Sequence, residues 1–108
     1  GDVGNIVLRD RQHLAEAGII IVVMTLEAGS GLLLAGPDIV SRGFVYVRGA
    51  ESLMDEARKV LGDVMDFCMY KNITDWGRIK TEIKDELGEF VWKKTKRRPM
   101  IMPIIMEV

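Results

Sequence analysis

The sequence predicts an α+β fold, in which a small mixed three-stranded β-sheet carries two amphipathic helices packed on one face. Three observations predict it: two apolar runs separated by a glycine-rich turn, two consecutive stretches with helical periodicity, and one further apolar run at the end. The expected order is short helix, strand, strand, helix, helix, strand. The first two strands are expected to form an antiparallel hairpin, and the last strand can then lie parallel to a neighbour.

Length and composition indicate one small domain. Of the 108 residues, 1–17 are expected to form a linker with a short helix that ends at Gly18, and 18–108 to form the α/β domain. The net charge of −1 gives no global attraction to nucleic acid or to a membrane. The single cysteine, Cys68, excludes a disulfide within the chain and fits a reducing cytoplasm.

The predicted strands follow from β-branched and apolar residues. Ile19–Leu26 is apolar at both parities and is expected to be buried on both faces. Residues 32–36 return as a second strand, which Pro37 confines to a sheet edge or a bulge. Residues 44–47 form a further short extended piece, and residues 100–108 the last strand, with an interruption at Pro103.

The segment "GPDIVSRG" at residues 36–43 invites comparison with a phosphate-binding loop. It lacks GxGxxG and Gly-Lys-Ser/Thr, and no helix follows it directly. Asp38 and Ser41 are turn formers that are expected to bond their own backbone. A bent edge segment is therefore the favoured interpretation, and Arg42 is expected to pair with a carboxylate of an attached domain.

Two amphipathic helices follow. The first is expected to begin near Ser52, with an apolar stripe that ends at Cys68. Thr74 is expected to cap the second, which ends in the basic run "KKTKRRP", where cations suit a helix C-terminus and Pro99 cannot continue the helix.

Catalytic chemistry finds little support in these residues. His13 is the only histidine and is expected to be a surface residue rather than a ligand. Cys68 lies on an apolar stripe, where cysteine behaves as a small hydrophobe. The carboxylates are scattered among lysines, so no catalytic, cofactor-binding or metal residue is predicted.

An interaction surface is the stronger hypothesis. Two helices can cover only one face of a small sheet, so the other face should present apolar side chains that a soluble monomer rarely leaves open. Trp92 is expected on the outer side of the second helix, beside the space left at Gly88. The predicted interface residues are Trp92, Gly88, Ile20, Val22, Met100 and Met102.

The basic run supports a second hypothesis, which is contact with an RNA backbone. Its five cations are Lys93, Lys94, Lys96, Arg97 and Arg98. Compensation of the helix C-terminus explains part of this run, and no aromatic ladder interleaves the cations.

Four segments of the chain also resemble a known family. "GDVGNIVLRDR", "GPDIVSRGFVYV", "ITDW" and "TKRRPMIMPIIMEV" are similar to the C-terminal domain of ribonuclease J and its preceding linker. The resemblance covers essentially the whole chain, and the last two segments are the most distinctive.

The resemblance implies a parent enzyme of the metallo-β-lactamase superfamily with an inserted β-CASP domain. Such enzymes are zinc-dependent 5′-to-3′ exonucleases that also cut internally, and they process and degrade bacterial RNA. Their HxHxDH-type metal cluster is missing from this sequence, so this chain is expected to hold no zinc and to be no enzyme by itself. It is expected instead to form a homodimer and to support the catalytic and β-CASP domains, meeting RNA only within the full enzyme. The alternative is an autonomous RNA-binding module that uses residues 93–98.

Overall fold

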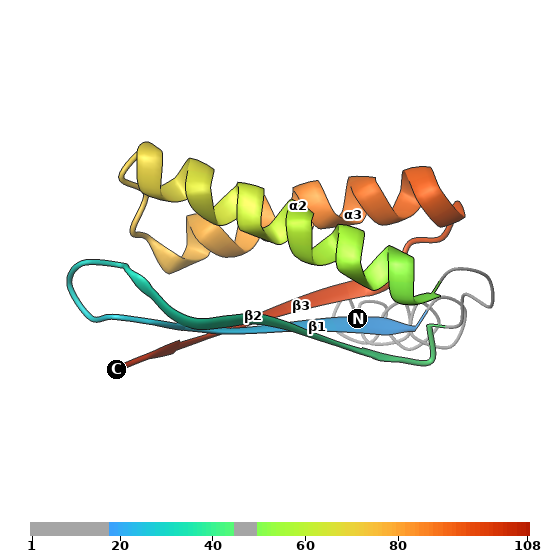
Figure 1. Cartoon of the computed structure of the whole chain (residues 1–108), viewed down its shortest axis with the longest axis horizontal. Coiled ribbons are helices and arrows are strands. Elements are labelled where there is room, and N and C mark those ends of the chain that lie inside the picture. The colour runs from blue at the N-terminus through green and yellow to red at the C-terminus, as the bar shows by residue number, and fades with distance from the viewer. Residues whose placement is uncertain (1–17, 45–49) are drawn as a thin grey trace, which may run out of the picture.

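The structure is a computed structural model that describes residues 18–44 and 50–108. The elements run in the order β1 (Ile19–Leu26), β2 (Leu33–Arg42), α2 (Ala50–Tyr70), α3 (Trp76–Thr95) and β3 (Met100–Glu107). The two helices lie as one layer on one face of the sheet, and the opposite face carries no other described element (Figure 1). This confirms the predicted α+β fold.

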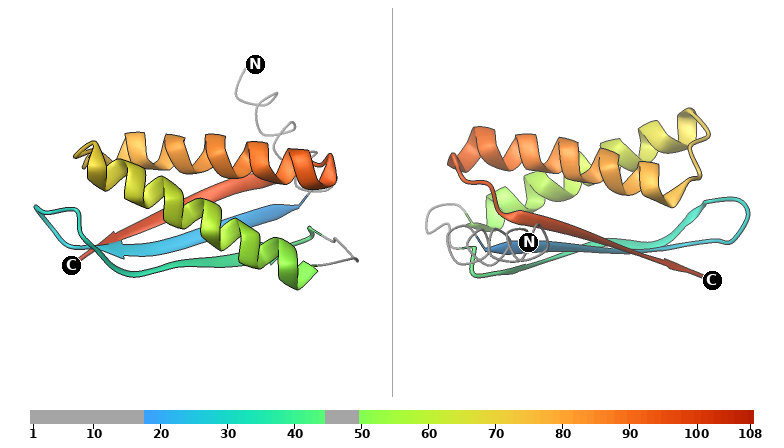
Figure 2. Two further views of the ribbon diagram at one scale, coloured as in Figure 1. Left: turned by 45° about the horizontal axis from the view of Figure 1, so that its top comes forward. Right: turned by 180° about the vertical axis from the view of Figure 1, so that it is seen from behind.

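The sheet has the order β2-β1-β3 and is mixed. β1 pairs with β2 as an antiparallel hairpin and with β3 in parallel, so the predicted mixture is confirmed. The two additional views show both helices crossing above the same three strands (Figure 2). Because β1 is central, its side chains determine what each face of the sheet presents.

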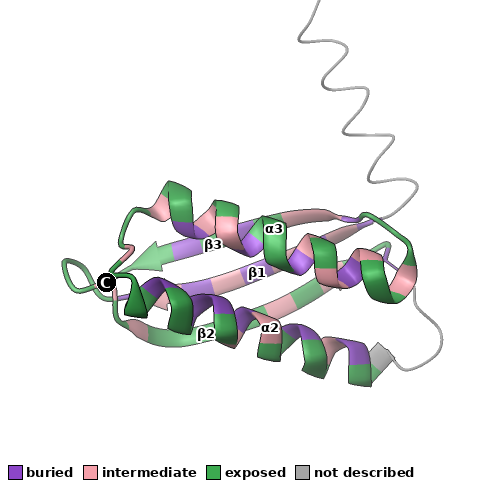
Figure 3. Ribbon diagram, turned by 90° about the horizontal axis from the view of Figure 1, so that it is seen from above, coloured by how far each residue is buried: buried purple, intermediate pink, exposed green. Residues whose placement is uncertain are grey.

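The core lies between this sheet and the helices. Alternate residues of β1 point into it, and the helices contribute one stripe each, which the burial colouring shows on their facing and inner sides (Figure 3). Cys68 belongs to the α2 stripe, as predicted. The buried apolar residues are Ile20, Val22, Met24, Leu26, Phe44, Leu53, Ala57, Leu61, Val64, Met65, Cys68, Ile79, Ile83, Leu87, Val91 and Ile105. Each large aliphatic side chain among them stabilises the fold by roughly 1.5–3 kcal/mol relative to its exposed state.

The prediction that Pro37 confines the second strand to a sheet edge or a bulge is confirmed, because β2 is an edge strand whose register against β1 shifts beside Pro37. The predicted end of that strand at residue 36 and the predicted interruption at Pro103 are wrong. β2 continues through Pro37 to Arg42, because an edge strand tolerates a missing donor and because the register against β1 shifts between Val23 and Thr25. Asp38 and Ser41 are therefore strand residues and not turn formers. β3 likewise runs without a break through Pro103, which lies on the second edge strand and is buried beneath the helices.

The helix boundaries also differ from the expected ones. α2 begins at Ala50, before Ser52. Asp75 and not Thr74 is the N-cap of α3, and its side chain makes no capping hydrogen bond. α3 ends at Thr95 because Lys96 adopts a left-handed conformation and donates its backbone N–H to the Trp92 carbonyl.

Some predictions fall outside the described residues. These are the linker and short helix over residues 1–17, with His13, and the extended piece beyond Phe44. Phe44 itself is a buried residue that follows the end of β2 and lies outside any strand.

Gly18, just before β1, lies very close to the backbone that follows β2. Gly18 and Gly29 both have a positive φ, of 78° and 87°. A Cβ at Gly18 would collide with backbone atoms of Gly43 and Phe44, whereas one at Gly29 would meet nothing within 4 Å. We expect Gly29→Ala to cost about 1–2 kcal/mol for its backbone conformation, and Gly18→Ala to cost about 1–3 kcal/mol more for the collision. Urea unfolding of both variants measures the difference, and equal losses would contradict the close approach.

Candidate interaction surfaces

The face of the sheet opposite the helices is lined by the remaining residues of each strand. The registers place Ile21 of β1 between Val40 of β2 and Met102 of β3. We define the open sheet face by its apolar members, which are Ile19, Ile21, Val23, Val40, Met100, Met102, Ile104 and Met106. Val40, Met102, Ile104 and Met106 are 39%, 42%, 39% and 49% exposed. Contiguous exposure of this kind is typical of an interaction surface.

The structure separates the predicted interface residues by parity. Ile20 and Val22 are 1% and 0% exposed and lie beneath the helices, so they are core residues and not surface residues. Their neighbours Ile19 and Ile21 take the places on the open sheet face. Met100 and Met102 do lie on that face. The sequence could not decide this because both parities of β1 are apolar.

Trp92 lies apart from the open sheet face, on α3. It is half-buried, and it lines a shallow hollow of about 440 Å³ together with Gly88. Gly88 faces β3, since a Cβ there would lie 3.5 Å from the Ile101 Cδ1 atom. The Arg98 guanidinium lies 4.5 Å and the Lys96 ammonium 5.3 Å from the indole centroid, so cation–π contacts already occupy part of the ring.

The basic run is partly neutralised within the chain. Lys93 pairs with Glu89 at 3.0 Å, which is the helical pair that the spacing predicts, and Lys94 lies 3.6 Å from Glu56 of α2. Exposed pairs of this kind contribute little stability. The structure thus brings Trp92 together with cations that follow the helix, a combination that linear spacing had hidden.

Over residues 18–44 and 50–108, no three histidine, cysteine, aspartate or glutamate side chains gather where they could hold a metal ion. Neither described helix is long and apolar enough to cross a membrane.

Cys68 is the one described cysteine, and its surroundings oppose reactivity. Its side chain is 1% exposed. Burial, and secondarily the negative charge of Glu82, raise the pKa of the Cys68 thiol, while Arg78 acts weakly in the opposite direction. A protonated, buried thiol is a poor nucleophile.

Comparisons with known proteins identify the family of the chain. The family model of the ribonuclease J C-terminal domain matches residues 6–108. The chain belongs to the ribonuclease J C-terminal domain family. It is 46% identical over all 108 residues to ribonuclease J2 of Bacillus subtilis, and equally so to ribonuclease J 2 of Staphylococcus saprophyticus and of Staphylococcus aureus strain NCTC 8325.

The match covers the whole of this chain but only 19–20% of each of those relatives. The chain thus spans about a fifth of the length of the ribonucleases that it matches, and it corresponds to their C-terminal domain. Its family is one of RNA-processing enzymes.

Cys68 provides a chemical test of the core. We expect native protein to react with iodoacetamide at least about a hundredfold more slowly than protein unfolded in urea, because alkylation requires local opening. Because burial disfavours the thiolate and raises the pKa of Cys68, the folded state keeps its full stability below the ordinary thiol value of 9.0. That stability is lost as the pH rises through the raised pKa of the folded state. Mass spectrometry of timed samples measures the alkylation rates of the native and the urea-unfolded protein. Rapid alkylation of the native state would show that the α2 stripe is open to solvent.

Proposed function

We propose that this chain is a non-catalytic domain that joins copies of a ribonuclease J-like enzyme through the open sheet face. One observation carries the proposal: a three-stranded sheet with helices on one side only leaves a row of isoleucine, valine and methionine side chains on the other. Burying such a row against a second copy removes apolar area from water, at roughly 25 cal/mol for each Å².

The geometry suits sheet-on-sheet packing. Two copies stacked through this face would interdigitate their methionine and isoleucine side chains about 10 Å apart, as the inner faces of a sandwich do. Asp38 and Arg42 flank Val40 along the β2 edge and supply a polar rim. A stable dimer buries about 1,200–2,000 Å² in total, so the contact would have to cover the apolar side chains of this face together with its polar rim.

The proposed pairing would join the catalytic domains of a longer parent enzyme. By similarity to its family, the remainder of such a protein holds a zinc-dependent metallo-β-lactamase domain and a β-CASP domain, which degrade and process RNA in the cytoplasm by exonucleolytic and internal cleavage. A C-terminal domain that pairs would hold two catalytic units together without touching the scissile bond. No residue of this chain then takes part in the reaction.

Met102 and Met69 offer a matched test of self-association. Both are exposed methionines, at 42% and 51%, but only Met102 lies on the open sheet face. We expect wild type to be dimeric at tens of micromolar and Met102→Glu to raise the dissociation constant at least roughly a hundredfold, because an unpaired carboxylate must be desolvated. Met69→Glu on α2 should leave it unchanged. Sedimentation equilibrium measures all three proteins.

Trp92→Glu tests whether the chains associate through α3 around Trp92 and not through the open sheet face. A monomeric wild type at these concentrations would contradict the proposal. So would a dimer that Trp92→Glu dissociates and Met102→Glu does not, since the contact would then lie on α3.

Contact with RNA is the second candidate, and the cluster of Trp92 with Arg98 and Lys96 favours it. An indole beside two cations can stack on a base while the cations meet phosphates. Binding to RNA phosphates would weaken strongly with salt, whereas self-association through the apolar sheet face would not.

A salt titration decides this candidate. We expect binding of single-stranded RNA to weaken with a log–log slope of about −0.7 for each phosphate contact, and Arg98→Ala to weaken it further. Lys71→Ala is the control, because Lys71 also lies beside an aromatic ring, 5.8 Å from the Tyr70 centroid, but outside the basic run. Equal effects of the two variants, or binding that is insensitive to salt, would exclude a site at residues 93–98.

A further inference from the structure

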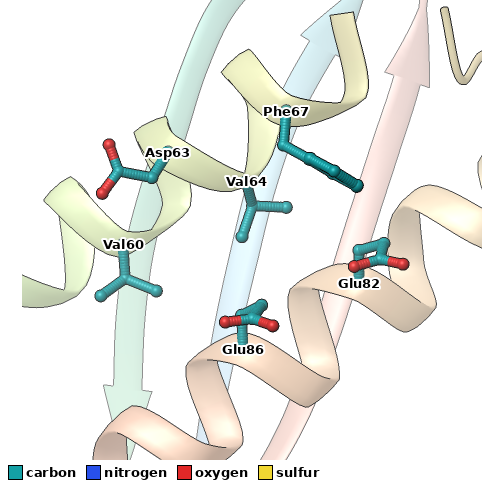
Figure 4. A pocket seen from close by; sticks show the side chains of 6 residues that line it. All are labelled: Val60, Asp63, Val64, Phe67, Glu82 and Glu86. Atoms are coloured by element: carbon teal, nitrogen blue, oxygen red, sulfur yellow. The ribbon is translucent and has the colours of Figure 1, made fainter. Parts of the chain in front are cut away.

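The helix layer carries a second, independent concave surface on the side away from the sheet. A groove of about 370 Å³ lies between α2 and α3, within the size range of small ligand pockets. Its lining is Val60, Asp63, Val64, Phe67, Glu82 and Glu86. We call it the interhelical groove. Figure 4 shows the apolar side chains coming from α2 and the two glutamates standing on α3 across from them.

The apolar part of the groove is accessible. Val64 is a core residue that forms the inner wall of the groove at 5% exposure, while Phe67 is 42% exposed. Val60 is intermediate. A half-exposed phenylalanine beside two valines offers an apolar seat for one side chain of a partner.

The polar part is entirely acidic. Asp63, Glu82 and Glu86 make no ion pair or hydrogen bond with another described residue. Two other acidic residues of α2 do have cationic partners: Asp55 is paired with Arg58 at 2.8 Å, and Glu56 lies 3.6 Å from Lys94.

The spacing of these carboxylates argues against a metal ion and for an extended cation-bearing ligand. No three acidic side chains in the described ranges converge closely enough to share one ion. They stand on both walls of a groove instead, where they would meet separate cations along a segment. The same negative charge repels phosphate, so the groove does not suit RNA.

We infer that the interhelical groove binds a cationic amphipathic segment of a partner protein, which seats an apolar side chain against Phe67 and pairs its lysines or arginines with Glu82, Glu86 and Asp63. This is helix-in-groove recognition with charge complementarity fixing the register. Because the groove and the open sheet face lie on opposite layers, the domain can use both at once, and neither proposal depends on the other.

The test uses the 108-residue chain labelled with ¹⁵N and a short amphipathic peptide of leucine and lysine as the probe. We expect amide shifts at Val60, Val64, Phe67 and Glu82 to change on titration. The same peptide with glutamate in place of lysine should produce none. Glu82→Gln with Glu86→Gln should weaken binding roughly tenfold, and Phe67→Ala should weaken it by a similar factor.

A matched pair on the same helix controls for general attraction between opposite charges. Asp85→Asn with Glu89→Gln removes two negative charges from α3 outside the groove, beside Trp92. This pair should leave the affinity within about twofold of wild type. Equal weakening by both pairs, shifts that map to the sheet or to Trp92, or binding of the acidic peptide would each overturn the inference.

Discussion

The structure depends on one constraint, which is that two helices cover only one face of a three-stranded sheet. Side chains alternate along β1, so Ile20, Val22, Met24 and Leu26 form the base of the core while the residues between them face the other way. The parallel pairing of β1 with β3 extends that second face with methionine and isoleucine. The core and the proposed interface are thus two consequences of the same alternation, and a one-residue slip in register would exchange them.

Much of this architecture follows from the sequence, and the failures have physical reasons. Helical periodicity identified both helices and the buried position of Cys68, and the order of elements implied the mixed sheet. The parity of β1 stayed undetermined because a strand that is apolar on both sides gives no alternation to read, so Ile20 and Val22 were assigned to the wrong face. Pro37 correctly indicates an edge strand with a bulge, whereas the interruption expected at Pro103 is absent because β3 is also an edge strand, where a missing N–H can leave no ladder bond unmade. The contact of Arg98 with Trp92 depends on the chain reversing after Lys96, which no helical wheel displays.

The described surface divides into regions of different chemistry. The open sheet face is apolar, the interhelical groove is apolar with an acidic rim, and the end of α3 is basic with one indole. Surfaces that differ in this way suit different partners and do not compete for one of them. The two proposals together would let one small domain contact a second copy of itself and a partner segment at the same time.

Intermolecular contacts across the open sheet face can be observed directly by isotope-filtered NOE spectroscopy on a mixture of ¹³C-methyl-labelled and unlabelled chains. Self-association through this face predicts NOEs from the methyl groups of Met102, Ile104 and Met106 to protons of the unlabelled copy, and none from methyl groups beneath the helices such as those of Ile83. Intermolecular NOEs that arise instead from residues on α2 or α3, or none at all at concentrations where the chain sediments as a dimer, would contradict it.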